Sequence, residues 1–337
     1  YDSAGICLQE NNELLIFKDK GRIKNLITII DGLSPNAISG IGHTRWATHG
    51  EPNQINSHPH TDCKNSIAIV HNGIIENYTE IKKFLESKGH IFKSETDSEV
   101  ISHLIEEVYE GDFNESFLNM LKIIEGAYAI LAMDKNTPNT IIGARKGSPL
   151  ILGIGNNENF LVSDPSAIVG YTANVVYLDD GEVVIIKNNE FEILDPVSKK
   201  SINKKVEHIS WSLKEISKDG YPDFMLKEIF EQQQTIKNAF RGRISIENYD
   251  VKLGGLKLTP KDIQDIQRVF FISCGTSWHA GIYAKYVMED LSRIISEHEY
   301  ASEFRYRNPL IKEDDIFFFI SQSGETADTL AALKLVK

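Results

Sequence analysis

The sequence is poor in several features that mark particular classes of protein. It has three cysteines in 337 residues, Cys7, Cys63 and Cys274, and none belongs to a C-x-x-C pair. This scarcity excludes a disulfide scaffold and a cysteine-rich zinc site, and it favours a reducing compartment, so we expect a cytoplasmic protein. No apolar run reaches the roughly eighteen residues that a membrane-spanning helix needs, so no transmembrane segment is expected.

The chain also has fewer basic than acidic residues. The chain has 36 Lys and Arg against 48 Asp and Glu, a formal net charge of −12. This balance argues against non-specific binding to nucleic acid or to anionic membranes, and neither is expected as a partner. The patterns G-x-x-x-x-G-K-[ST] and G-x-G-x-x-G are absent, so neither a nucleoside triphosphate nor a dinucleotide is indicated. The length predicts about two domains.

The N-terminal part of the chain mixes helices with many strands. Helices are predicted to begin at two capping-box pairs and to end at glycines, with a third helix after them: Asn77 with Glu80 to Gly89, Thr96 with Glu99 to Gly111, and 117–121. Short apolar runs predict strands at 6–8, 66–70, 128–133, 140–144, 160–163, 174–178, 182–187 and 191–194. The run at 66–70 is predicted to end in a turn at His71-Asn72-Gly73, and Asp180-Gly181 and Asn188-Asn189 are read as hairpin turns. Strands joined in this way beside helices indicate an antiparallel α+β domain.

The C-terminal part has a different pattern. Residues 196–266 are polar and irregular apart from a helix predicted over 224–240, which indicates a linker with a connecting helix. Buried-type strands follow at 269–273 and 316–321, each running into a loop and a helix, and Phe-Phe-Ile-Ser occurs in both, at 270–273 and 318–321. A repeated strand–loop–helix unit is typical of a parallel, doubly wound α/β sheet.

Both of these loops are rich in hydroxyl side chains at the start of a helix. The N–H groups and dipole of a helix N-terminus favour an anion, and hydroxyls add donors, so two such loops could hold a phosphate. Ser, Thr and Gly are also simply common in turns, and spacing alone leaves both readings open. The stretches Cys274-Gly275-Thr276-Ser277 and Ser321-Gln322-Ser323-Gly324-Glu325-Thr326 resemble a sugar isomerase (SIS) domain. The resemblance implies a sugar-phosphate site at Cys274, Gly275, Thr276, Ser277, Ser321, Gln322, Ser323 and Thr326.

Three polar clusters interrupt the N-terminal part: 43–50, 71–73 and 94–97. An α-amino acid substrate needs a bidentate donor for its carboxylate, a carboxylate for its ammonium and donors for an oxyanion if its side-chain amide is attacked. Arg45, Asp97 and the Asn72-Gly73 turn could fill these roles. Each also has a plainer reading: Arg45 as a pairing arginine, Asp97 as an acid in the first turn of a helix, and Asn72-Gly73 as a simple turn.

Together these clusters resemble the class II (N-terminal nucleophile) glutamine amidotransferases. The match rests on YDSAG at 1–5, HTRWATHG at 43–50, HPH at 58–60, HNGIIEN at 71–77 and SETDSE at 94–99. It implies an αββα sandwich over residues 1–210. It further implies that Arg45, Thr48 and His49 bind glutamine, with Arg45 on its carboxylate and Asp97 on its ammonium. By the same resemblance Asn72 and Gly73 form the oxyanion hole, and Trp46 gates the passage of ammonia.

The two resemblances together imply an enzyme of amino sugar biosynthesis. It would transfer the amide nitrogen of glutamine to fructose 6-phosphate, giving glucosamine 6-phosphate and glutamate, without a cofactor. Residues 1–210 would be the amidotransferase domain, 211–265 a linker and 266–337 part of a first SIS domain, and the whole protein would be a homo-oligomer. An amidotransferase acting on phosphoribosyl pyrophosphate is a weaker alternative, because the loop at 321–326 does not suit it. A non-catalytic sugar-phosphate-sensing module is the third reading.

The family's nucleophile is an N-terminal cysteine whose own amine serves as base. This chain opens at Tyr1 and closes inside a predicted helix at Lys337, so we expect a fragment that does not hydrolyse glutamine and lacks the isomerase residues. Cys7, in a predicted strand, and Cys63, in a polar loop, have no free α-amine and are rejected as nucleophiles. Cys274 is expected to pack within the sugar loop.

A metal site is not expected. His58-x-His60 with His49 and His71 resembles a zinc cluster only loosely, no H-E-x-x-H pattern occurs, and the family needs no metal. The acidic residues Glu106, Glu107 and Glu110 are read as a solvated helix face.

Overall fold

The computed structural model describes residues 2–33, 35–45, 51–209, 218–240, 243–245, 250–251, 259–322, 324 and 326–336. The chain folds as two units, Tyr1–Ser212 and Leu213–Lys337. In the described residues, every helix is too short or too polar to cross a lipid bilayer. The predicted sites at Trp46, Thr48, His49 and Ser323 lie outside the described residues.

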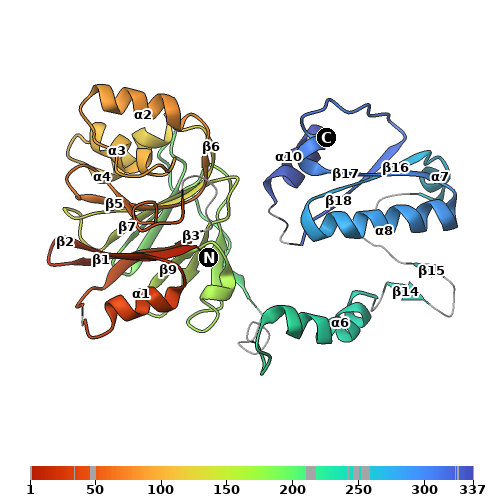
Figure 1. Ribbon diagram of the computed structural model, residues 1–337, viewed down its shortest axis with the longest axis horizontal. Helices are drawn as coiled ribbons and strands as arrows, with labels where there is room; N and C mark the ends of the chain where they lie inside the picture. Colours follow the sequence, from red (N-terminus) through yellow and green to blue (C-terminus); the bar gives the residue numbers. More distant parts are fainter. Residues whose placement is uncertain are drawn as a thin grey trace. The chain divides into compact units, whose positions relative to one another are not determined.

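The first unit is built from three sheets and a set of helices (Figure 1). Its strands are β1 (Ser3–Glu10), β2 (Glu13–Lys20), β3 (Ser39–Arg45), β4 (His60–Thr61), β5 (Ile67–Ile75), β6 (Gly126–Asp134), β7 (Thr140–Lys146), β8 (Ile151–Ile154), β9 (Asn159–Val162), β10 (Asn174–Tyr177), β11 (Val183–Lys187), β12 (Glu190–Leu194) and β13 (Glu207–His208). The helices among its described residues are α1 (Ile23–Ile30), α2 (Tyr78–Ser87), α3 (Glu99–Glu107), α4 (Phe113–Leu121) and a 3-10 turn, Pro165–Ala167.

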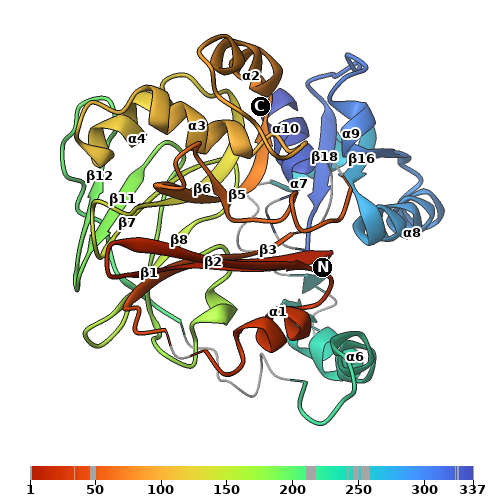
Figure 2. The same cartoon turned by 60° about the vertical axis from the view of Figure 1, so that its left-hand side comes forward.

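The strands of the first unit pair in three antiparallel orders: β12-β11-β7-β6-β5-β4, β2-β1-β3 and β13-β10-β8-β9. Helices α2, α3 and α4 cover one face of the largest sheet, and β1–β3 lie against its other face (Figures 1 and 2). Helix α1 packs on the outer side of β1 and β2. This is the αββα sandwich that the sequence implied.

The buried strand β5 explains how the layers are held together. Its odd-numbered residues Ile67 and Ile69 pack into the core beneath the helices, and Ala68 and Val70 pack into the core between the sheets. Successive strand side chains point to opposite faces, so a strand that is covered on both sides reads as one continuous apolar run.

Three local expectations for the first unit were wrong. The strand at 66–70 does not end at His71 but continues to Ile75. The turn at Asp180-Gly181 makes no hairpin, because β10 belongs to the sheet of β8 while β11 pairs with β7 and β12. Neither capping box forms: α2 begins after Asn77 and α3 after Ser98, and neither has a side-chain cap. The hairpin at Asn188-Asn189 is confirmed by the pairing of β11 with β12.

The second unit contains a parallel sheet in the order β17-β16-β18. Its elements are α6 (Phe224–Phe240), β14 (Ile244–Ser245), β15 (Asp250–Val251), α7 (Pro260–Gln264), β16 (Arg268–Ser273), α8 (Gly275–Ser292), β17 (Ile295–Tyr300), α9 (Ala301–Phe304), β18 (Asp315–Ile320) and α10 (Ala327–Val336). Phe270 and Ile272 pack with α9 and α10, while Phe271 and Ser273 approach Gly281 of α8. Helices therefore cover both faces of the sheet, as in the predicted doubly wound α/β fold.

Candidate functional site

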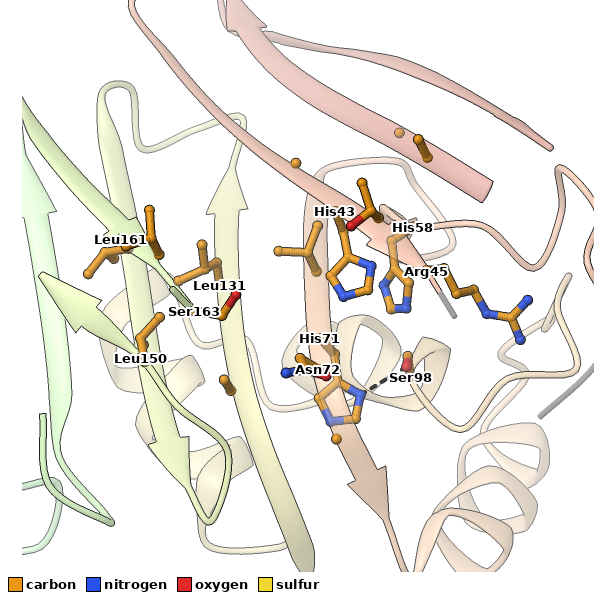
Figure 3. A pocket seen from close by; sticks show the side chains of 18 of the residues that line it. His43, Arg45, His58, His71, Asn72, Ser98, Leu131, Leu150, Leu161 and Ser163 are labelled. Atoms are coloured by element: carbon orange, nitrogen blue, oxygen red, sulfur yellow. Dashed lines mark hydrogen bonds between the residues drawn. The ribbon is translucent and has the colours of Figure 1, made fainter. Parts of the chain in front are cut away.

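A cavity of about 880 Å³ lies in the first unit between β3 and β5. Arg45, His43, His58 and His71 gather at one end, and Leu131, Leu150 and Leu161 line the other (Figure 3). A pocket with one polar end and one apolar end suits a small molecule that carries charged groups on a short carbon chain.

Two opposite charges line this cavity, as predicted for an α-amino acid. Arg45 is the last residue of β3 and only 5 % exposed, and Asp97 is 6 % exposed. Burial lowers the pKa of the Arg45 guanidinium, although the carboxylates of Asp2 and Asp97 act to raise it. Asp97 also accepts a hydrogen bond from the Ile75 N–H to its Oδ2, at 2.8 Å. The expected position of Asp97 in a first helical turn was wrong, since α3 begins at Glu99.

The Asn72-Gly73 pair lies within β5 rather than in a turn. Gly73 has φ +142°, and a Cβ there would stand 2.0 Å from the carbonyl oxygen of Ala127. Only glycine fits this backbone. Asn72 is exposed and follows the buried His71, so the two side chains point to opposite faces of the strand (Figure 3). Both Asn72 and Gly73 line the cavity, next to the segment that carries Asp97.

The segment before α3 is held by a network of buried polar groups. The Oγ of Ser94 lies 3.0 Å from Thr96 Oγ1, which lies 3.1 Å from His60 Nε2. Glu99 accepts from the N–H groups of Lys93 and Ser94, at 2.9 and 2.6 Å. Burial acts to raise the pKa of Glu99, but its hydrogen bonds with His103, Lys93 and Ser94 outweigh this and lower it to about 2. The Glu99 side chain therefore stabilises the loop before α3 by accepting these backbone hydrogen bonds. The sequence had predicted that Glu99 would instead form a capping box with Thr96.

Four histidines gather near Arg45: His58, His60 and His71 are buried and His43 is half-buried. Sequence reasoning grouped three of them, with His49, only as a loose zinc-like cluster. The rings of His43 and His58 lie 4.3 Å apart, and those of His58 and His60 lie 4.7 Å apart. His71 Nδ1 lies 2.9 Å from Ser98 Oγ (Figure 3). Within the described residues His43 Nδ1, His58 Nδ1 and His71 Nε2 are buried without a hydrogen-bond partner. Part of the signal was in the sequence, because these four histidines stand in the motifs at 43–50, 58–60 and 71–77.

Burial is the main reason why these imidazoles stay neutral. It lowers the pKa of His43 to about 4, that of His60 to about 3 and that of His71 to about 4. It also lowers the pKa of His58 well below its usual range, and the neighbouring histidines and Arg45 add to the effect. Because these rings are neutral, the Arg45 guanidinium is the one positive charge among the described residues that line this end of the cavity.

The cysteines of the first unit do not present a nucleophile to this cavity. Cys7 lies in β1 with no exposed surface, and burial raises the pKa of its thiol to about 12. Cys63 is exposed in the turn between β4 and β5 and does not line the cavity. Both positions agree with the rejection of these residues as nucleophiles.

In the second unit the two hydroxyl-rich loops follow neighbouring strands. Because β16 and β18 pair in parallel, the loops after Ser273 and Ile320 lie at the same edge of the sheet. Helix α8 begins at Gly275, with Cys274 as its N-cap. The sequence pattern predicted a helix only from about Trp278, with 274–277 as a loop, so the helix starts three residues earlier than expected. Cys274 is half-buried and packs against the core of this unit.

The second loop of this edge is folded around the hydroxyl of Ser321. Ser321 Oγ accepts a hydrogen bond from the Gly324 N–H at 3.0 Å and lies 3.2 Å from Thr326 Oγ1. Thr276, at the start of α8, is exposed. Neither loop sequence, 274–277 or 321–326, contains a lysine or an arginine. An anion at this edge would be held by hydroxyls and helix-terminal N–H groups.

Comparison with protein families separates the same two parts of the chain. Residues 43–169 match the glutamine amidotransferase domain family, and residues 262–337 match the SIS domain family.

Curated relatives match along the whole chain. Over 337 residues it is 48 % identical to a glutamine–fructose-6-phosphate aminotransferase (isomerizing) from Caldanaerobacter subterraneus. Over 338 residues it is 47 % identical to the protein of the same name from Thermotoga maritima. Both matches cover 100 % of this chain and 55 % of the relative, so the chain spans about half the length of these proteins.

Solved structures add a comparison of folds. The allosteric regulatory enzyme of purine biosynthesis matches 58 % of this chain and 43 % of its own chain, with 29 % identity and a TM-score of 0.51. The glutamine phosphoribosylpyrophosphate amidotransferase from B. subtilis matches 96 % of this chain and 63 % of its own, with 21 % identity and a TM-score of 0.50, a likeness of fold alone. The folds, the two family matches and the full-chain relatives agree: the chain carries matches to a glutamine amidotransferase domain and to an SIS domain, and it is similar over its whole length to glutamine–fructose-6-phosphate aminotransferases.

Proposed function

We propose that the polypeptide containing this chain transfers the amide nitrogen of glutamine to fructose 6-phosphate, giving glucosamine 6-phosphate and glutamate. The observation that carries the proposal is that two buried side chains of opposite charge, Arg45 and Asp97, line one cavity beside the Asn72-Gly73 backbone. An α-amino acid needs both charges, and the attack on its amide needs the donors.

In the glutamine half of the reaction each residue has a stated role. The Arg45 guanidinium binds the α-carboxylate, and Asp97 binds the ammonium. The side-chain amide of Asn72 and the N–H of Gly73 donate to the oxyanion that forms when the amide carbon is attacked. Thr48 and His49 complete the glutamine site, and Trp46 gates the released ammonia. The attacking group is an N-terminal cysteine, as in the class II amidotransferases.

In the sugar half the phosphate of fructose 6-phosphate binds at the strand–helix edge of the second unit. Thr276, Ser277, Ser321, Ser323 and Thr326 supply hydroxyl donors, while Cys274, Gly275 and Gln322 shape the loops. The match of residues 262–337 to the SIS family supports a sugar phosphate as acceptor rather than phosphoribosyl pyrophosphate. The protein acts as a cytoplasmic homo-oligomer, without a cofactor and without nucleic acid or membrane as partner.

The test traces the amide nitrogen of glutamine into the amino sugar. The native polypeptide that contains these residues is incubated with fructose 6-phosphate and glutamine labelled with ¹⁵N at the amide, in a buffer containing unlabelled ammonium. We expect equal amounts of glutamate and ¹⁵N-labelled glucosamine 6-phosphate, measured by mass spectrometry. D-Glutamine, which cannot place its carboxylate and ammonium on Arg45 and Asp97 together, serves as the control. Glutamate release with no amino sugar, or an amino sugar formed only from phosphoribosyl pyrophosphate, would refute the proposal.

A further inference from the structure

Four side chains outside the cavity converge on one point of the first unit. Cys63 comes from the turn between β4 and β5, His90 from the chain that follows α2, and His103 and Glu106 from α3. One ligand atom of each, Sγ, the two Nδ1 atoms and Oε2, lies within 4.8 Å of the other three. Thiolate, imidazole and carboxylate are the ligands that Zn²⁺ takes in proteins.

The separations are close to the edges of a metal-centred tetrahedron. With bonds of about 2.3 Å to sulfur and about 2.0–2.2 Å to nitrogen and oxygen, those edges are roughly 3.3–3.6 Å long. Cys63 Sγ lies 3.6 Å from His90 Nδ1 and 3.4 Å from His103 Nδ1, and the two Nδ1 atoms are 3.2 Å apart. Glu106 Oε2 lies 3.4 Å from His90 Nδ1 and 4.0 Å from His103 Nδ1. A cation at the centre needs only small adjustments.

Both histidine rings are oriented as metal ligands. Each turns its Nδ1 inward, while its outer Nε2 faces a carboxylate: His90 Nε2 lies 3.2 Å from Glu107 Oε2, and His103 Nε2 lies 3.5 Å from Glu99 Oε1. Carboxylates behind the rings favour the proton on Nε2, so the Nδ1 lone pairs point at one another. Two lone pairs in such an arrangement repel each other unless a cation lies between them.

The charges and the surroundings of the cluster also suit a divalent ion. A Cys63 thiolate and the Glu106 carboxylate together balance two positive charges. The His103 side chain is 1 % exposed and that of His90 is 8 % exposed. Cys63 lies at the surface, so an ion can reach the cluster from solvent. Lys64 pairs with the other oxygen of Glu106, Oε1, at 3.2 Å, so Oε2 stays directed at the cluster. Glu106 is therefore no part of a solvated face, contrary to expectation.

We propose that Cys63, His90, His103 and Glu106 form a structural Zn²⁺ site. Four protein ligands close the coordination sphere and leave no position for a substrate. The ion joins the β4–β5 turn and the chain after α2 to helix α3, whose preceding residues Asp97 and Ser98 line the cavity. It thereby fixes the helix behind the charged end of the pocket. The site stands on its own geometry and does not depend on the proposed function.

Direct metal binding is the test. The 337-residue chain is stripped with a chelator and titrated with Zn²⁺ against a chromophoric competitor, and in parallel with Co²⁺. We expect one Zn²⁺ per chain, a thiolate-to-cobalt charge-transfer band with the visible spectrum of tetrahedral cobalt, and a rise in Tm of roughly 5 °C or more at saturating zinc.

Matched variants locate the ion. Cys63→Ser and His90→Gln should each weaken zinc binding by about a hundred-fold or more, and Cys63→Ser should abolish the charge-transfer band. Cys63 is exposed and Gln keeps a polar group of similar size at the half-buried His90, so these variants should still fold, which circular dichroism checks. His208→Gln and His279→Gln remove exposed histidines elsewhere in the chain and should leave zinc binding unchanged. Zinc bound at less than one ion per chain, or binding that survives Cys63→Ser and His90→Gln unchanged, would overturn the proposal.

Discussion

The two units present different kinds of groups to charged ligands: the first presents charged side chains and the second presents neutral donors. The first buries a full positive and a full negative charge, Arg45 and Asp97, and surrounds them with neutral histidines. The second offers hydroxyls and helix-terminal N–H groups at the open edge of a parallel sheet, with no basic residue in either loop.

This difference follows from the ligands that each unit is proposed to bind. A zwitterionic amino acid has no net charge but two charged ends, so a site must carry both signs and hold them apart from water to be selective. A phosphate is hydrated and carries one sign of charge, and oriented N–H dipoles at a helix N-terminus suffice for it. The first arrangement costs stability because it needs buried polar groups, whereas the second uses groups that every helix already exposes.

The largest effect that should separate the two units is the pH dependence of stability. Burial lowers the pKa values of His43, His60 and His71 to about 4, 3 and 4, so the unfolded chain binds protons below about pH 6.5 that the folded chain does not bind until the pH falls to about 4 or lower. The free energy of unfolding of the first unit is therefore unaffected above this window and falls as the pH drops through it. From about pH 7.5 to about pH 5.5 we expect a loss of roughly 1.3 kcal/mol for each histidine, or about 4 kcal/mol together.

Denaturant unfolding at the two pH values measures this loss, with a chelator present so that metal release does not contribute. His43→Gln should recover about a third of it. Exchanging the exposed histidines His208 and His279 for asparagine should leave it unchanged. An equal free energy of unfolding at both pH values would mean that the buried rings accept protons in the folded state.

A smaller change in free energy is expected from removing one of the two charges in the cavity, Arg45 or Asp97. Arg45→Ala in the native polypeptide should weaken the use of glutamine by roughly thirty- to a thousand-fold, about 2–4 kcal/mol, with fructose 6-phosphate binding nearly unchanged. Asp97→Asn keeps an oxygen for the Ile75 N–H and tests the negative charge alone. Steady-state kinetics in each substrate gives the readout, and Arg243→Ala, at an exposed position, is the control. Equal losses for both substrates would make Arg45 a structural residue.

The layers and most elements of both units could be predicted because they depend on local periodicity. Helix α6 spans the predicted residues 224–240, and Gly89 follows α2 with φ +96°, as a helix stop requires. The capping boxes failed because tertiary partners competed for the same side chains. Asn77 accepts from the Glu125 N–H and donates to the Ile123 carbonyl, and Glu99 binds the N–H groups of Lys93 and Ser94. Sequence spacing carries no signal for such partners.

Among the site residues, those that belong to sequence motifs could be predicted, and those brought together by packing could not. Arg45, Asp97, Asn72 and Gly73 could be placed in one cavity because motifs carried them, although nothing local revealed that Gly73 must approach Ala127. The cluster of Cys63 with His90 and His103 escaped because 27 and 40 residues separate the cysteine from the two histidines. Ligands brought together by packing follow no fixed spacing, unlike ligands on a single helix.

A smaller effect per contact than at Arg45 should come from the phosphate loop of the second unit. Ser323→Ala with Thr326→Ala removes two hydroxyl donors and keeps every backbone N–H. We expect a loss of roughly 1.5–3 kcal/mol for each contact to a charged group, about ten- to a hundred-and-sixty-fold for one contact and at least about a hundred-fold for both. Calorimetric titration of the native polypeptide with fructose 6-phosphate and with unphosphorylated fructose measures the loss, and glutamine binding is the internal control. The loss should be confined to the phosphorylated sugar, because neutral donors hold only the phosphate. If both sugars weaken equally, the loop serves packing alone, and the contrast between a charged site and a neutral one fails.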